Sequence, residues 1–238
     1  MLAAPFIGSF LGVLVTRLPT RRTVLWGRSS CERCRHRLRP ADLVPIASWL
    51  ALRGRCRYCG AKIAPFHILI ELAALGVALW AATVAQGGLL WASCCLGWGL
   101  LALAALDLRA GILADALTLP LAGIGIAIAV IAEPQVFFDR VIGAIAGFAS
   151  FALIRWLYRR LRGREGLGLG DAKLLAAAGA WVGWQGLPSI VLIGAVLGLL
   201  SVAATSLRHG RPRLEQRLAF GPCLCLATWI IWLYGPVL

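Results

Sequence analysis

Eight long apolar runs constrain this chain more than any other feature of its sequence. They cover residues 2–18, 66–84, 89–106, 116–132, 136–156, 172–184, 187–206 and 218–237. A helix needs about 20 apolar residues to cross the ~30 Å hydrocarbon core of a bilayer, and 60% of this chain is hydrophobic. We therefore predict an all-α polytopic membrane protein with about eight transmembrane helices. The first run lacks a basic n-region and a small-x-small cleavage site, so we expect a retained span rather than a signal peptide.

The basic residues indicate how these helices are oriented. The chain has 24 Lys and Arg residues and a net charge of +14, and eight crossings place all of them except Arg140 on one side of the membrane. Because Lys and Arg accumulate in cytoplasmic loops, that side is assigned to the cytoplasm and both termini to the outside. The positive charge is thereby explained by topology and by contact with anionic membrane lipids. No basic motif with interleaved aromatic residues indicates nucleic-acid binding.

Four cysteines mark the one sizeable polar region, which lies between the first and second runs. The pairs Cys31/Cys34 and Cys56/Cys59 form the pattern C-x2-C-x21-C-x2-C. Two such pairs are typical of a four-thiolate zinc site. Disulfides are the alternative, but they are rare in the reducing cytoplasm where the charge pattern places this loop. Four cysteine ligands leave no open coordination position for water, so the predicted Zn²⁺ is structural rather than catalytic.

A glycine-rich segment opens the sixth apolar run. Gly168 and Gly170 directly precede Asp171, and Lys173 follows in the apolar sequence. The spacing excludes both a Walker-type phosphate loop and a dinucleotide-binding turn. A carboxylate at the mouth of a membrane helix is a functional-site hypothesis, although an isolated Asp there also fits a helix N-cap.

Two more aspartates lie between the third and fourth runs. Asp107 ends the third run and Asp115 precedes the fourth. Taken alone, Asp107 fits an interfacial charge beside Arg109, and Asp115 fits a helix cap. Topology, however, brings Asp107 and Asp171 to the same membrane face at nearly the same depth. Two carboxylates that share one proton support amide hydrolysis, in which the ionised one activates water and the protonated one donates to the carbonyl oxygen.

Together these residues resemble a known family, the type IV prepilin peptidases. These bifunctional leader peptidase/N-methyltransferases are Gly-x-Gly-Asp membrane aspartyl proteases. The matching segments are residues 8–19, the two cysteine pairs, 48–50, 53–56, Asp107, 168–171, 174–183 and 220–222. The chain departs from the family pattern at Glu32, at Ala114 and at 66–68, where the family usually has Pro, Pro and Arg-Tyr-Pro. We find no internal repeat.

The resemblance implies an activity and a division of the chain. Residues 1–18 are expected to form the first span, 19–65 a cytoplasmic zinc loop associated with methyl transfer, and 66–238 the aspartyl peptidase domain of a bacterial inner-membrane protein. Prepilin or pseudopilin precursors are the implied substrates, and S-adenosylmethionine is the implied methyl donor. The site residues assigned on this basis are catalytic Asp107 and Asp171, supporting Gly168, Gly170, Asp115 and Lys173, and cofactor-binding Gly54 and Glu71.

Other functions remain open at this point. A non-enzymatic membrane protein could use its zinc loop to recruit a partner, with the aspartates acting only as caps. A peptidase without methyltransferase activity is disfavoured by the intact tetracysteine loop. An ion-coupled transporter would need charges deeper in the spans, where Glu71 is the one candidate. The sequence does not indicate an oligomeric state.

Overall fold

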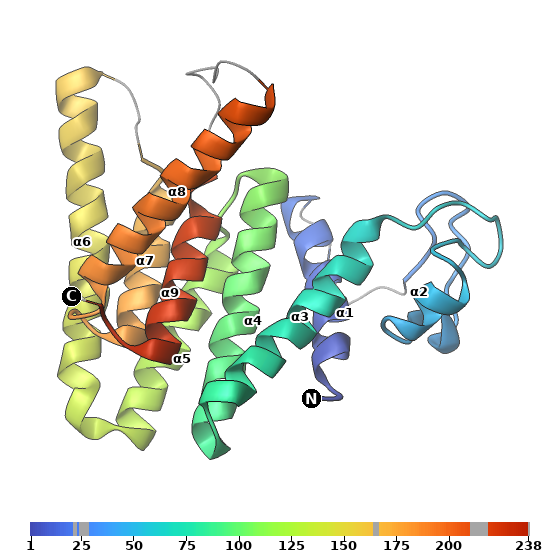
Figure 1. The fold of residues 1–238 in the computed structure, drawn as a ribbon, viewed down its shortest axis with the longest axis horizontal. Coiled ribbons are helices and arrows are strands. Elements are labelled where there is room, and N and C mark those ends of the chain that lie inside the picture. The colour runs from blue at the N-terminus through green and yellow to red at the C-terminus, as the bar shows by residue number, and fades with distance from the viewer. Residues whose placement is uncertain (21–22, 24–28, 164–166, 210–218, 238) are drawn as a thin grey trace. The chain divides into compact units, whose positions relative to one another are not determined.

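The structure, a computed structural model, describes residues 1–20, 23, 29–163, 167–209 and 219–237. Within these ranges the regular elements are helices, and two isolated β-bridges are the only β structure. Figure 1 labels the α-helices along the chain. The elements are α1 (Ala4–Arg17), η1 (Leu18–Thr20), η2 (Pro40–Leu43), α2 (Ala47–Ala51), α3 (Pro65–Val84), α4 (Gly87–Ala110), α5 (Asp115–Ala132), η3 (Pro134–Val136), α6 (Phe137–Arg162), α7 (Leu169–Val182), α8 (Leu187–His209) and α9 (Gly221–Tyr234).

Each predicted apolar run corresponds to one of the helices that the structure describes, which confirms the all-α polytopic fold. Among the described residues, five helices are long and apolar enough to cross a membrane, namely α3, α4, α5, α6 and α8. The other three, α1, α7 and α9, have 14 residues each. For these shorter helices a full crossing stays a prediction.

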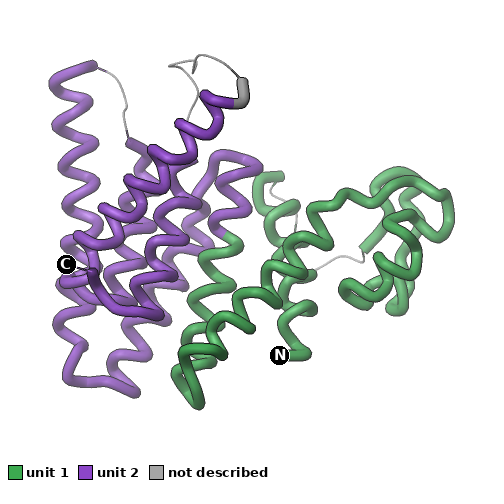
Figure 2. Tube along the Cα trace, in the orientation of Figure 1, with its two compact units in different colours: residues 1–102 green, residues 103–238 purple. Residues whose placement is uncertain are grey.

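Two compact units divide the chain inside α4, at Met1–Ala102 and Leu103–Leu238 (Figure 2). This division by compactness differs from the functional division at residues 18 and 65, which stays a prediction. In the N-terminal unit α1 packs along α3, because Gly8 lets the two backbones approach closely. A β-carbon at Gly8 would lie 2.6 Å from the Glu71 Cα. The first part of α4 joins this unit through Trp98, whose Nε1–H donates to the Ala74 carbonyl at 3.0 Å.

Helix α7 is the central element of the C-terminal unit. It contacts α5, α6, α8 and α9, and eight of its 14 residues are buried. The buried residues are mostly alanine and leucine, which present little polar surface to the neighbouring helices. A helix that is packed on all sides has apolar residues around its whole circumference. This explains why the sequence of the run 172–184 shows no polar face.

Small residues let α6 and α7 meet backbone to backbone. A β-carbon at Gly143 would lie 2.6 Å from the Gly179 carbonyl oxygen, and one at Gly147 would lie 2.6 Å from the Leu175 carbonyl oxygen. Separations this short leave no room for a side chain. Close approach of small residues is a common way for helices to associate in membranes, and here it fixes the helix that carries Asp171.

Candidate active site and metal site

Asp171 lies in the first turn of α7, with Gly168 as the N-cap residue. The carboxylate is turned back toward the Gly168 backbone N–H. An acidic residue at the third helical position makes this reverse contact in a capping box. The interpretation of Asp171 as the N-cap is therefore wrong, because the N-cap residue of α7 is Gly168 and Asp171 is the third residue of the helix. A β-carbon at Gly168 would lie 3.0 Å from Asp171 Oδ2, so glycine keeps this side of the carboxylate open.

Asp107 lies in the last turn of α4 and meets the start of α9. Its carboxylate is directed at the Gly221 backbone N–H. A β-carbon at Gly221 would lie 2.6 Å from Asp107 Oδ2, so this approach requires glycine. The N-terminal end of a helix favours negative charge, and Asp107 is held at that end of α9.

The structure brings the two predicted catalytic aspartates together. Their carboxylates lie within electrostatic range of each other. Leu113 lies beside both of them, because its side chain packs at the Cβ positions of Gly170, at 2.9 Å, and of Gly221, at 3.3 Å. Chain segments far apart in sequence thus meet at one point of the C-terminal unit, and the arrangement has two interacting carboxylates with glycine on either side.

The supporting residues Asp115 and Lys173 form an ion pair with each other. Lys173 Nζ donates to Asp115 Oδ1 and Oδ2, both at 2.7 Å. Asp115 is the first residue of α5, its N-cap is Ala114, and no side chain caps this helix. The cap interpretation of Asp115 is therefore wrong, because its carboxylate is directed to α7 rather than to the N–H groups of its own helix.

The four predicted zinc ligands also converge. The Sγ atoms of Cys31, Cys34, Cys56 and Cys59 all lie within 4.8 Å of one another, and those of Cys31 and Cys59 are 3.9 Å apart. Thiolates on tetrahedral zinc, with Zn–S of about 2.3 Å, are about 3.8 Å apart. The donor set and its spacing fit Zn²⁺.

Each cysteine pair sits in a short hairpin-like segment of the same local fold, which we call a knuckle (residues 30–37 and 55–62). In the first knuckle the Arg35 N–H donates to the Cys31 carbonyl at 2.9 Å, and in the second the Gly60 N–H donates to the Cys56 carbonyl at 2.9 Å. Both Arg35 (φ 56°) and Gly60 (φ 68°) have a left-handed backbone conformation. One β-bridge closes each knuckle: Ser30 with Arg37, and Arg55 with Lys62.

Sequence reasoning missed Asp42, which ties the second knuckle to the segment between the two. Its Oδ1 accepts from Arg57 Nε at 2.7 Å, and its Oδ2 accepts from the Arg39 N–H at 3.2 Å. The Arg57 guanidinium holds the pKa of the Asp42 carboxyl below its usual range. The basic surroundings of a single buried acid in the loop were the signal that could have identified it.

The two residues assigned to the methyl donor have structural contacts. Gly54 is left-handed at φ 66°, and a β-carbon there would lie 2.8 Å from the Trp49 ring. Glu71 is buried, and its Oε2 accepts from the Ile46 N–H at 2.8 Å. Ile46 itself has φ 61°, which is strained for a β-branched residue. Glu71 therefore anchors the zinc loop to α3, and its cofactor role stays a prediction.

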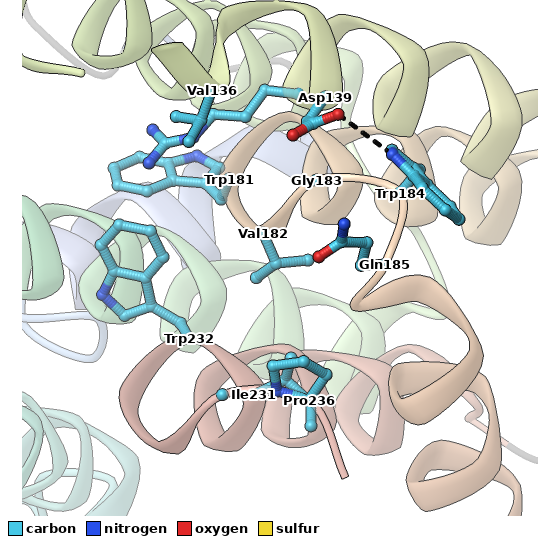
Figure 3. A pocket seen from close by; sticks show the side chains of 12 residues that line it. Val136, Asp139, Trp181, Val182, Gly183, Trp184, Gln185, Ile231, Trp232 and Pro236 are labelled. Carbon is cyan, nitrogen blue, oxygen red and sulfur yellow. Dashed lines mark hydrogen bonds between the residues drawn. The ribbon is translucent and has the colours of Figure 1, made fainter. Parts of the chain in front are cut away.

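A cavity of about 250 Å³ lies at the other end of α7 and contains none of the predicted site residues. Figure 3 shows its lining, where Trp184 Nε1–H donates to Asp139 Oδ1 at 3.1 Å. Arg140 is buried there, is paired with Glu133 and lies over the Trp232 ring. The predicted catalytic residues and this cavity are thus at opposite ends of α7.

Comparisons with known proteins identify the family of the chain. Residues 2–85 match the family model described as bacterial peptidase A24 N-terminal domain, and residues 94–203 match the type IV leader peptidase family. A prepilin leader peptidase/N-methyltransferase of Burkholderia pseudomallei is 41% identical, over 92% of this chain and 79% of that protein. Proteins of the same name from Dickeya chrysanthemi (95% of this chain, 88% of that one) and Pseudomonas aeruginosa (96% and 87%) are 39% and 36% identical. No solved structure matches. The chain belongs to the type IV leader peptidase family.

Proposed function

We propose that this protein is a membrane aspartyl endopeptidase that removes the leader of prepilin-like precursors, with Asp107 and Asp171 as its catalytic pair. The observation that carries the proposal is that the two carboxylates converge around Leu113 and lie within electrostatic range of each other. Family membership supports it, since relatives that cover almost the whole chain are named prepilin leader peptidase/N-methyltransferase.

The chemistry needs no covalent intermediate. Two close carboxylates hold one proton between them, because their like charges oppose a second ionisation. The ionised carboxylate takes a proton from water as the water oxygen attacks the scissile carbonyl carbon, and the protonated one donates to the carbonyl oxygen. The C–N bond then breaks, and the leaving amine takes up a proton. The pair acts as one titrating unit, so neither aspartate is assigned a fixed role.

The zinc loop belongs to the second activity in this proposal, methylation of the new N-terminal amine. S-adenosylmethionine supplies the methyl group when it is bound. The four cysteines would hold Zn²⁺ as thiolates, and all four coordination positions are then filled by protein. Bound metal would order the loop, and Glu71 joins the loop to α3 through the Ile46 N–H.

We further infer that the zinc loop and the catalytic pair face the cytoplasm of a bacterial inner membrane. The support is the charge asymmetry, since all Lys and Arg residues except Arg140 fall on one side when eight runs cross, and Lys and Arg accumulate on the cytoplasmic side. Prepilin or pseudopilin precursors and membrane lipids are the partners in this proposal, and nucleic acid is not one.

Reporter fusions test this topology. Fusions after Arg57 and Arg162 are expected to report the cytoplasm, and a fusion at Leu238 is expected to report the outside. A cytoplasmic signal at Leu238 would mean that the number of crossings is odd. In that case one of the shorter helices does not cross, and the sidedness proposed here is wrong.

A peptide assay tests the activity itself. The purified full-length protein is incubated with a prepilin peptide, with and without S-adenosylmethionine, and the products are identified by mass. We expect cleavage in both reactions and a mass gain of one methyl group only with the methyl donor. Cleavage without methylation supports a peptidase alone, and the absence of both supports a non-enzymatic zinc-loop protein.

A further inference from the structure

We propose that the Asp115–Lys173 ion pair, with Leu113 packed on Gly170, is a clasp that sets the position of Asp171 relative to Asp107. The inference rests on the proposed peptidase function and assigns positioning roles for that reaction. Neither Asp115 nor Lys173 acts on the substrate in this scheme, because each acts through the aspartate that its own segment carries.

The clasp joins the two segments that carry the catalytic residues. Asp107 lies in the last turn of α4, and its carbonyl accepts a hydrogen bond from the Gly111 N–H at 2.8 Å. Gly111 has φ 62°, and the chain turns at this residue. The segment then reaches Asp115, which is bound by both carboxylate oxygens to Lys173 Nζ on α7. Between these points Leu113 packs against Gly170, the residue before Asp171. A short segment that starts at one catalytic aspartate is thus fastened twice to the helix of the other.

The ion pair also sets the rotation of α7 about its axis. Successive residues of a helix are turned by about 100°, so the side chains of Asp171 and Lys173, two positions apart, leave on nearly opposite faces. Holding Lys173 against α5 therefore directs Asp171 to the other face. That face contains Asp107, whose carboxylate lies against Gly221 at the start of α9.

The exposure of the pair argues that its role is geometric rather than stabilising. The Lys173 side chain is 27% exposed and that of Asp115 is 54% exposed. Ion pairs this open to solvent contribute little to folding stability. Catalysis is far more sensitive, because a displacement of about 1 Å at a reacting group can cost about 100-fold in rate.

Variants of the pair test the clasp in steady-state cleavage of a prepilin peptide by the purified full-length protein. Asp115→Asn and Lys173→Met are each expected to lower kcat roughly 10- to 100-fold, with KM and the thermal midpoint nearly unchanged. Lys173→Arg keeps the charge and both hydrogen bonds, so it is expected to retain near-wild-type kcat. The exchange Asp115→Lys/Lys173→Asp restores the pair and is expected to recover most of the loss.

Two results would overturn the clasp. One is a wild-type kcat in both single variants, and the other is single variants that lose activity while the exchange recovers none of it. If a single variant does not fold, the exchange variant decides alone. An active exchange variant supports the clasp, and an inactive one contradicts it. Retained cleavage in Asp107→Asn or Asp171→Asn is a different result, since it removes the proposed function rather than the clasp.

Discussion

Asp107→Asn and Asp171→Asn are each expected to lower prepilin cleavage by roughly 10³-fold or more, with membrane insertion unchanged. An asparagine can neither accept the proton of the attacking water nor share a proton with its neighbour. The double variant is expected to be hardly worse than either single one, because residues that act as a unit show strongly non-additive losses. Cleavage rates and detergent-extracted yields are measured on the same preparations.

Asp139→Asn is the matched control for this prediction. Asp139 is a half-buried aspartate of the same unit, and it is bonded to Trp184 at the other end of α7 from Asp171. The control tests whether loss of any carboxylate of this unit reduces activity, and near-wild-type cleavage is expected. Near-wild-type turnover in either Asp107→Asn or Asp171→Asn would show that the aspartyl mechanism does not apply to this chain.

Cys56→Ser/Cys59→Ser is expected to abolish zinc binding and to reduce methyl transfer much more than cleavage. Removal of two of four thiolates leaves an incomplete site, and metal binding drives the folding of small zinc modules. The proposed catalytic aspartates lie in the other compact unit, so the loss of metal is not expected to remove a residue of the proposed peptidase site. Elemental analysis, methylation and cleavage on one preparation check all three expectations.

Cys94→Ala/Cys95→Ala offers a matched control, because these adjacent cysteines belong to α4 and lie outside the knuckles. This variant is expected to keep one zinc ion per chain. If a zinc-free Cys56→Ser/Cys59→Ser protein methylates at the wild-type rate, the assignment of the zinc loop to methyl transfer is wrong. The tetracysteine loop would then be a structural or partner-binding module.

Much of the fold and of the candidate site could be predicted because it depends on the length of apolar runs or on short local motifs. Apolar runs identify membrane helices from length alone, and C-x2-C pairs place their thiols on one side of a tight turn. Asp107 and Asp171 were paired from the number of crossings between them, which fixes the membrane face. None of these inferences needs the rotation of a helix about its axis.

What sequence reasoning missed does depend on that rotation or on backbone conformation. Asp115 and Lys173 are 58 residues apart, and their pairing follows from how α7 is turned against α5, so a local cap rule gave the wrong partner. The repeated knuckle was also invisible, because its left-handed position holds Arg35 in one copy and Gly60 in the other. Arginine accepts that conformation at a cost of about 1 kcal/mol, which sequence similarity does not reveal.

The length of α7 has a consequence for how a precursor reaches the catalytic pair. Its 14 residues span about 21 Å, about 9 Å less than a ~30 Å hydrocarbon core. Exposed tryptophans often mark a membrane interface. If Trp184 marks the interface at the far end of α7, Asp171 lies below the interface at the near end, in a recess. Fluorescence quenching of a probe at Leu169 would measure the depth of this recess. An extended chain advances about 3.3 Å per residue, so about three unwound residues would carry a scissile bond down to the dyad. Under the proposed function, the short α7 would therefore favour precursors that are extended, not helical, where they are cut.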